Sequence, residues 1–154
     1  MSVYQNILVA VDLSEEAHQV VNKAIAIAGV GDHLALVHVG RPIEHVFGGF
    51  GAIGLAGDFS EQMATLEQQA SAHAAQKLKD LRAVLGVPES RKFAPIGHAA
   101  TEIQRVAGEL EADLVVIGTH GRHGLGPLLG STANGVLQGV KRDVLAVRVH
   151  VPER

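Results

Sequence analysis

The sequence contains short, mainly aliphatic runs that alternate with longer segments of helical spacing. The runs cover residues 7–11, 34–39, 113–117 and 143–151. Apolar runs without polar alternation are typical of parallel strands that are buried on both faces. A weaker strand is expected at 91–96, where Pro95 favours an edge position because proline cannot donate a ladder hydrogen bond.

The segments between these runs predict helices. Their expected ranges are about 15–29, 60–85, 100–110 and 131–139. Ser14 suits the N-cap of the first helix, and an apolar stripe from Met63 to Leu85 marks one face of the second. Strands and helices alternate to the end of the chain without a repeat or a linker. We therefore expect a single α/β domain over residues 1–154, with an open parallel sheet and helices on both faces.

Composition limits the possible functions of this domain. The chain has 154 residues, 47% of them hydrophobic and 19% charged, as expected for one globular domain. Its formal net charge of −3 argues against a nucleic-acid partner, and the lack of cysteine excludes disulfides and thiolate metal sites. The N-terminus has neither a basic region nor a long apolar run, so we expect a cytoplasmic protein without a membrane partner.

Three candidate site residues end or follow predicted strands. Asp12 follows the first strand, Val39 ends the second, and Gly118 follows the fourth. In open parallel sheets, ligands bind outside the carboxyl ends of the strands, near the point where the strand order reverses. The sequence therefore predicts that these three residues share one binding site.

A glycine-rich stretch at 118–131 lies between the fourth strand and the last helix. Glycines let a ligand approach the backbone closely, and a helix N-terminus offers free N–H groups and a positive dipole end. Ser131 is expected at the N-cap of that helix, where its hydroxyl adds a further polar group. This order of elements predicts a site for a phosphate group.

Three other phosphate-binding classes fit the sequence less well. A phosphate-loop NTPase requires G-x-x-x-x-G-K-S/T, and no lysine precedes Ser131. A dinucleotide fingerprint would follow the first strand, whereas the glycines at 124–130 follow the fourth and are spaced one residue too far apart. A phospho-receiver domain would use Asp12 as phosphoacceptor, but Glu15 and Glu16 lie on the predicted helix rather than beside that strand end.

The loop matches the pattern G-x2-G-x8-G-S through Gly118, Gly121, Gly130 and Ser131. This pattern resembles the nucleotide-binding signature of the universal stress protein family, which is usually written G-x2-G-x9-G-S/T. The resemblance extends over nearly the whole chain, with matching segments at 7–12, 36–39, 113–122 and 144–148. One residue is missing between Gly121 and Gly130, so the preference among AMP, ADP and ATP stays open.

The resemblance implies a five-stranded sheet in the order 3-2-1-4-5. It also implies homodimers that pair the last strand, here residues 143–151. The family has members that bind ATP and members that bind no nucleotide. Carried over by position, Asp12 would bond the ribose hydroxyls with Gly118 behind them, Val39 would read the adenine edge through its backbone, and Ala10 would line the base pocket.

The phosphate contacts that the resemblance implies come from the loop and the following helix. They are Gly121, Gly130, Ser131 and Thr132. Arg122 and His123 are further candidates for a phosphate contact, with solvated loop residues as the alternative. His120 and His123 are spaced like metal ligands, but no carboxylate lies near them in the sequence. His38 is expected to be a hydrogen-bonded core histidine rather than a ligand.

The stretch 118–132 is better suited to binding than to catalysis. It has no carboxylate, and Arg122 carries its only full positive charge, so ATP or AMP would bring any Mg²⁺ through the phosphates. The sequence predicts an adenine-nucleotide-binding regulatory protein of the stress response with an unidentified protein partner, and slow ATP hydrolysis stays open. The alternatives are a nucleotide-independent dimeric scaffold and a weak ATPase or adenylyl-transfer enzyme.

A glycine-rich segment at 48–57 is predicted to be either a lid over the nucleotide or simply slack chain, that is, a connection without a function of its own.

Overall fold

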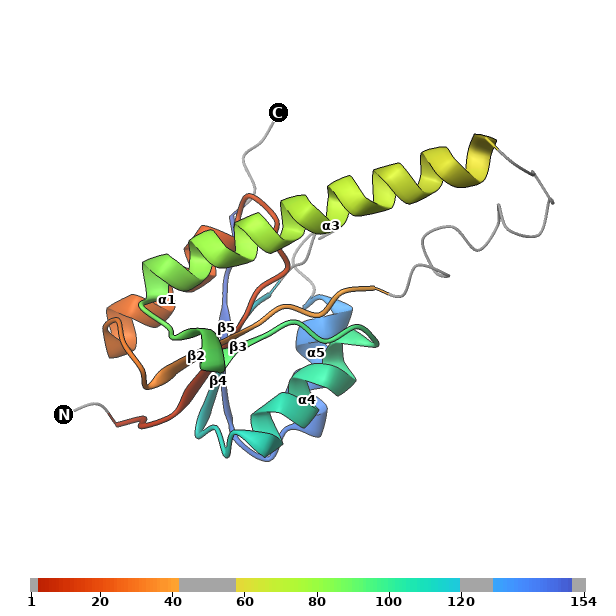
Figure 1. The fold of residues 1–154 in the computed structure, drawn as a ribbon. Helices are drawn as coiled ribbons and strands as arrows, with labels where there is room; N and C mark the ends of the chain where they lie inside the picture. Colours follow the sequence, from red (N-terminus) through yellow and green to blue (C-terminus); the bar gives the residue numbers. More distant parts are fainter. Residues whose placement is uncertain (1–2, 42–57, 120–128, 151–154) are drawn as a thin grey trace.

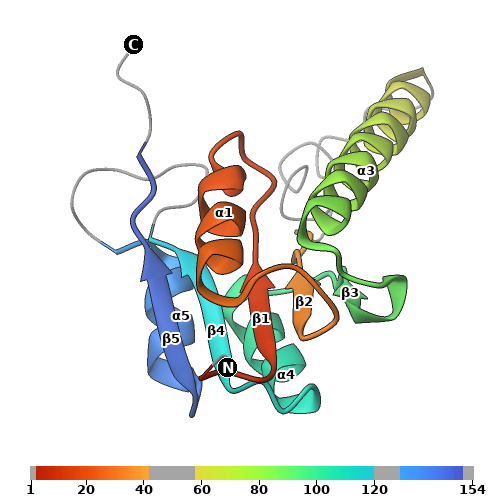
Figure 2. The ribbon, with the colours of Figure 1, turned by 90° about the vertical axis from the view of Figure 1, so that its left-hand side faces the viewer.

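The computed structural model describes residues 3–41, 58–119 and 129–150. Five parallel strands form one sheet in the order β3-β2-β1-β4-β5, and Figure 2 shows them side by side in this order. The strands are β1 (Ile7–Ala10), β2 (Leu34–Val37), β3 (Lys92–Phe93), β4 (Leu114–Gly118) and β5 (Asp143–Val147). The predicted fold class and strand order are confirmed.

Helices cover both faces of the sheet. They are α1 (Ala17–Ala28), α3 (Asp58–Leu85), α4 (Ala99–Glu109) and α5 (Ser131–Gly139), with the short 3₁₀ helix η2 (Glu89–Arg91) before β3. Residues of α1 and α3 share one core cluster with the sheet, and residues of α4 and α5 share the other. In Figure 2, α1 lies in front of the strands while α4 and α5 lie behind them.

The first strand shows why the apolar runs are unbroken. Ile7 and Val9 point into the cluster with α1 and α3, whereas Leu8 and Ala10 point into the cluster with α4 and α5. Because successive side chains of a strand point to opposite faces, a central strand between two helical layers needs apolar residues at every position. All four side chains are at most 5% exposed.

Both edge strands are shorter than the sequence predicts. The strand expected at 91–96 keeps only two residues in regular pairing, after which single contacts continue from the Gly40 N–H to the Pro95 carbonyl at 2.8 Å. The strand expected at 143–151 ends at Val147. Beyond it the chain is held by α1, because the Gln19 side chain donates to the His150 carbonyl at 2.8 Å and accepts its N–H at 2.9 Å.

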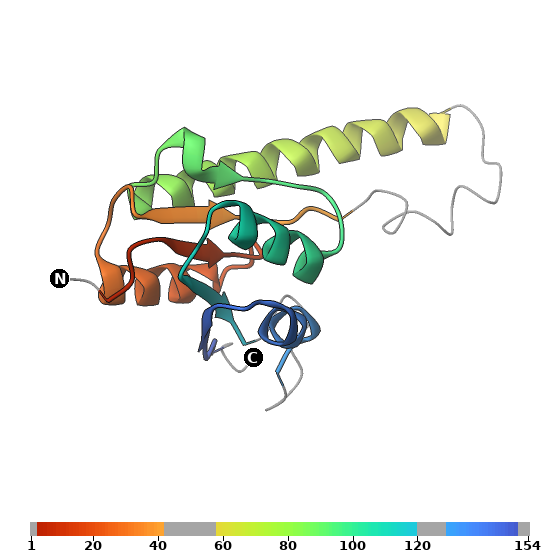
Figure 3. The same ribbon diagram turned by 90° about the horizontal axis from the view of Figure 1, so that it is seen from below.

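Helix α3 is much longer than the sheet that it covers. Its 28 residues span about 42 Å, whereas a five-residue strand spans about 17 Å. The predicted apolar stripe therefore packs only in the C-terminal half, where Leu78 and Leu85 are buried, while Leu66 in the other half is 55% exposed. Figures 1 and 3 show the N-terminal half extending past the rest of the described chain.

Two further points concern sequence predictions outside this core. The glycine-rich segment at 48–57, predicted as a lid or slack chain, lies outside the described residues. Among the helices that the structure describes, none has the length and apolar character needed to cross a membrane.

The contact between α4 and α5 depends on a glycine. A Cβ added at Gly135 would lie 2.8 Å from the Cβ of Ala100, whereas one added at Gly108 of α4 would meet nothing within 4 Å. We expect Gly135→Ala to lower the free energy of unfolding, because overpacking costs about 1–3 kcal/mol and outweighs the propensity gain of alanine. Gly108→Ala should raise it by about 0.5–1 kcal/mol. Urea denaturation measures both, and a gain in both variants would contradict this packing contact.

Candidate functional site

The carboxyl ends of β1, β2 and β4 meet at one edge of the sheet, which we call the carboxyl edge. Ala10, at the end of β1, is in register with Val37 on one side and Ile117 on the other. The predicted residues Asp12, Val39 and Gly118 come at or just after these three strand ends. The topology thus brings together the three strand ends from which a shared site was predicted.

Asp12 lies in a tight turn that follows β1. Its Oδ1 accepts the Ser14 N–H at 3.0 Å and the Ser14 hydroxyl at 2.7 Å, while Oδ2 has no hydrogen-bond donor within the described part of the chain. Ser14 was predicted as the N-cap of the first helix, and this is wrong. Helix α1 begins at Ala17 with Glu16 at the N-cap, because the Ser14 hydroxyl is engaged by Asp12 instead.

The turn contains a strained residue. Leu13 has φ +60° although it is not glycine, and its side chain is only 5% exposed. A left-handed conformation costs a bulky residue about 1–2 kcal/mol, so surrounding contacts must hold it. Such residues concentrate at functional sites, and this one adjoins the predicted ribose ligand.

The residues predicted around the base lie on the α4 and α5 side of the sheet. Ala10 is 5% exposed within that cluster, and half-buried Val39 packs against it. Next to Val39, the His38 ring places Nδ1 3.1 Å from the Val11 carbonyl. Because a carbonyl only accepts, Nδ1 carries the proton, which agrees with the prediction of a hydrogen-bonded histidine.

The two ends of the glycine loop meet beside β5. Thr119 donates its N–H to the Val147 carbonyl at 2.8 Å, and Gly130 donates its N–H to the Thr119 carbonyl at 2.6 Å. This second bond holds Gly130 extended at the N-cap of α5, so the helix begins at Ser131. The prediction of Ser131 as N-cap is therefore wrong by one position. Its hydroxyl makes no cap bond, and its side chain is exposed.

The N-terminus of α5 has the character of an anion site. The first intrahelical bond runs from the Asn134 N–H to the Gly130 carbonyl, so helix geometry leaves the N–H groups of Ser131 and Thr132 without an intrahelical acceptor. The positive end of the helix dipole adds its attraction for an anion to that of these N–H groups.

Four of the predicted loop residues lie outside the described residues: Gly121, Arg122, His123 and His120. Across the described ranges, no three His, Asp or Glu side chains group closely enough to hold a metal ion.

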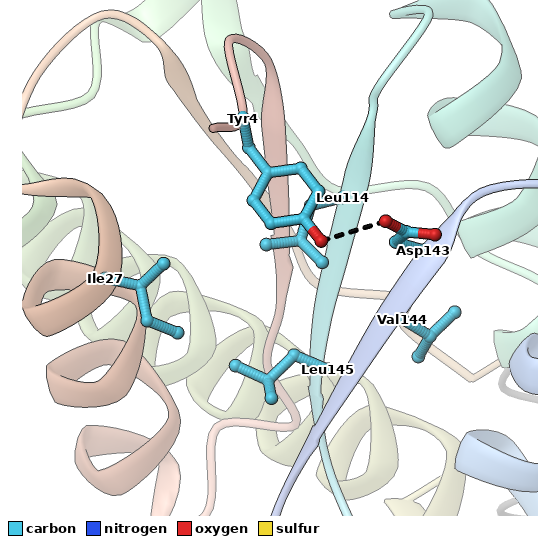
Figure 4. A pocket seen from close by; sticks show the side chains of 6 residues that line it. All are labelled: Tyr4, Ile27, Leu114, Asp143, Val144 and Leu145. Atoms are coloured by element: carbon cyan, nitrogen blue, oxygen red, sulfur yellow. Dashed lines mark hydrogen bonds between the residues drawn. The ribbon is translucent and has the colours of Figure 1, made fainter. Parts of the chain in front are cut away.

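A separate hollow lies at the opposite, amino end of the strands. Its volume is about 280 Å³, and it is lined by Tyr4, Ile27, Leu114, Asp143, Val144 and Leu145 (Figure 4). The Tyr4 hydroxyl donates to Asp143 Oδ2 across 2.8 Å. Sequence reasoning did not find this hollow, because the two partners are 139 residues apart and neither belongs to a recognisable motif.

The doubly wound sheet, with a helix N-terminus at its carboxyl edge, defines an α/β protein of the class that binds ligands outside the carboxyl ends of its strands. The model of the universal stress protein family matches residues 3–148. Universal stress protein A homolog 1 of Coxiella burnetii is 37% identical over 146 residues, which cover 94% of this chain and 96% of that protein. The chain belongs to the universal stress protein family, a family of stress-response proteins.

Solved structures agree with this fold. Universal stress protein UspA from Lactobacillus plantarum superposes with a TM-score of 0.63 at 22% identity, over 94% of this chain and 98% of that one. A universal stress protein in complex with cAMP superposes with a TM-score of 0.55 at 21% identity, over 94% and 96% of the two chains. At these identities the likeness concerns the fold alone.

The bond between Tyr4 and Asp143 predicts a titration. Donation to Asp143 raises the pKa of Tyr4 above its usual 10.0, since the neutral phenol is the form that donates. The bond's stabilising effect is therefore complete below pH 10.0 and is lost as the pH rises through the higher folded pKa. Tyr4 is the only tyrosine and tryptophan is absent, so tyrosinate absorbance reports this group alone. Asp143→Ala should move the midpoint down towards 10.0, and an unchanged midpoint would contradict the bond.

Proposed function

We propose that this protein binds an adenine nucleotide, ATP or AMP, at the carboxyl edge and acts as a regulatory protein of the stress response. The observation that carries the proposal is that two groups able to bind a nucleotide lie at the ends of neighbouring strands. Asp12 follows β1 with Oδ2 unoccupied among the described residues, and α5 begins close to the end of β4. The carboxylate suits ribose hydroxyls, and the helix N-terminus suits phosphates.

The arrangement supports an assignment of each part of the nucleotide. Ala10 and Val39 would contact the adenine, and Asp12 with Gly118 would hold the ribose. The Gly130 N–H is already donated to Thr119, so the phosphates would be bound by the N–H groups and hydroxyls of Ser131 and Thr132. We assign Gly121, Arg122 and His123 to the phosphates from the sequence pattern alone, and any Mg²⁺ to the phosphates themselves.

Two further lines support the proposal. The universal stress protein that was solved in complex with cAMP has the same fold, and cAMP contains the same adenosine unit. Among the described residues assigned to the site, Asp12 is the only carboxylate, and we assign it to the ribose, which favours binding over hydrolysis. We infer a binding protein whose nucleotide occupancy changes the surface offered to a protein partner in the cytoplasm.

Substitution of Asp12 tests the site. Asp12→Ala should weaken ATP binding by about tenfold to a hundredfold, because hydrogen bonds to a charged group contribute about 1.5–3 kcal/mol. Asp12→Ala combined with Gly130→Val should abolish binding. The backbone of Gly130, at φ −62° and ψ 156°, is in a region that valine adopts readily, so this substitution adds bulk at the proposed phosphate site without backbone strain. Isothermal titration calorimetry with ATP and AMP measures both effects.

Asp32→Ala is the matched control, since it removes an exposed carboxylate at the other end of the sheet. It should bind as the wild type does. Mass spectrometry of ligand released on denaturation identifies any nucleotide that co-purifies. Tight binding in the double variant would refute the site assignment, and a wild type that binds neither ATP nor AMP would favour a nucleotide-independent scaffold.

We also propose that the protein forms homodimers through the last strand and the segment that follows it, residues 143–151. β5 is an edge strand, and an uncovered edge presents free N–H and C=O groups. The Val147 carbonyl accepts from Thr119 on the β4 side. Because groups alternate along a strand, the backbone N–H and C=O of Val144 and Ala146 point outwards, where a second copy can pair with them.

A proline at the outward-facing position tests this dimer. Ala146→Pro removes an outward N–H and leaves the bonds to β4 intact, since proline is tolerated on edge strands. We expect a monomer with an unchanged circular dichroism spectrum. Ala146→Ser keeps the N–H and should stay dimeric. Sedimentation equilibrium distinguishes the two states, and a dimeric proline variant would contradict pairing through this edge.

A further inference from the structure

Lys77 of α3 contacts the turn that holds Asp12. Its Nζ donates to the Leu13 carbonyl at 3.2 Å, a contact between residues 64 positions apart. Lys77 is half-buried, and the next residue, Leu78, is buried in the core. The neighbouring residue Gln76 is already paired on this helix, because its side chain donates to the Asp80 carboxylate at 2.9 Å. Lys77 is thus directed to the turn rather than to a partner on its own helix.

The Leu13 carbonyl belongs to the same planar peptide as the Ser14 N–H. At one end of this plane the oxygen accepts from Lys77, and at the other end the N–H donates to Asp12 Oδ1 at 3.0 Å. Rotation of the plane would break both bonds together. Lys77 and Asp12 therefore oppose such a rotation from the two ends of the plane.

We propose that Lys77 is a positioning residue for the ribose site: it fixes the Leu13–Ser14 peptide and thereby the direction of the Asp12 carboxylate. This inference rests on the proposed nucleotide-binding function. Lys77 acts through Asp12 and does not touch the ligand. Its effect is therefore confined to the ribose hydroxyls and does not extend to the phosphates.

A comparison of two ligands isolates this effect. ATP carries the ribose hydroxyls that Asp12 reads, and 2′,3′-dideoxy-ATP lacks them while keeping the base and the phosphates. Lys77→Met keeps the length of the apolar stem and removes the donor. It should weaken ATP binding about threefold to tenfold, the lower part of the range for coupling within one hydrogen-bond network, and leave dideoxy-ATP binding unchanged. Lys77→Arg restores a cationic donor and should recover most of the ATP affinity.

Lys79→Met is the matched control, because it removes the same charge from an exposed position two residues along the helix. It should change neither affinity. Equal losses for both ligands in Lys77→Met would overturn the inference, since they indicate a phosphate contact or a general loss of structure. Unchanged ATP affinity would also overturn it. A wild type that binds neither ligand refutes the nucleotide site itself, an outcome distinct from wild-type binding that Lys77→Met leaves intact.

Discussion

The structure depends on a parallel sheet that is buried on both faces. Parallel strands need crossover connections, and the helices that make them cover both sides of the sheet. The central strands must then be apolar at every position, which leaves polar groups only at the strand ends. Because all five strands run the same way, these ends collect at two edges. Any chemistry that the protein performs at the sheet is confined to those two edges.

The carboxyl edge combines a strained turn with a helix N-terminus. In the turn after β1, Leu13 has a left-handed conformation that leucine does not favour, its side chain is buried, and its carbonyl accepts a hydrogen bond from Lys77. Strained residues concentrate at functional sites, and this one directly follows the carboxylate that we propose as the ribose ligand.

The fold could be predicted from the sequence because burial on both faces imposes its own pattern. The short, β-branched runs at 7–11 and 113–117 are typical of such strands, and the glycine loop follows one of them, as the sequence order predicted. Local capping could not be predicted in the same way. Ser14 and Ser131 have the right residue type for an N-cap, yet contacts with Asp12 in one case and the Gly130–Thr119 bond in the other move each helix start.

Contacts over long sequence separations also escaped prediction. The apolar stripe of α3 is continuous in the sequence, and only the short strands explain why Leu66 lies beyond the sheet that buries Leu78. The contact of Lys77 with Leu13 and that of Tyr4 with Asp143 join residues far apart in the chain, and lysines and aspartates follow no period that would reveal them.

Two aspartates show how the edges differ. At the amino edge, Asp113 uses both carboxylate oxygens on the chain itself, accepting the Gln5 N–H at 2.7 Å and the Asn6 N–H at 3.0 Å. At the carboxyl edge, Asp12 bonds the described part of the chain through Oδ1 alone, to Ser14. A carboxylate that is saturated by backbone donors serves the fold, whereas one with an oxygen left unpaired by the described residues can accept from an external donor. This asymmetry favours ligand binding at the carboxyl edge independently of the glycine loop.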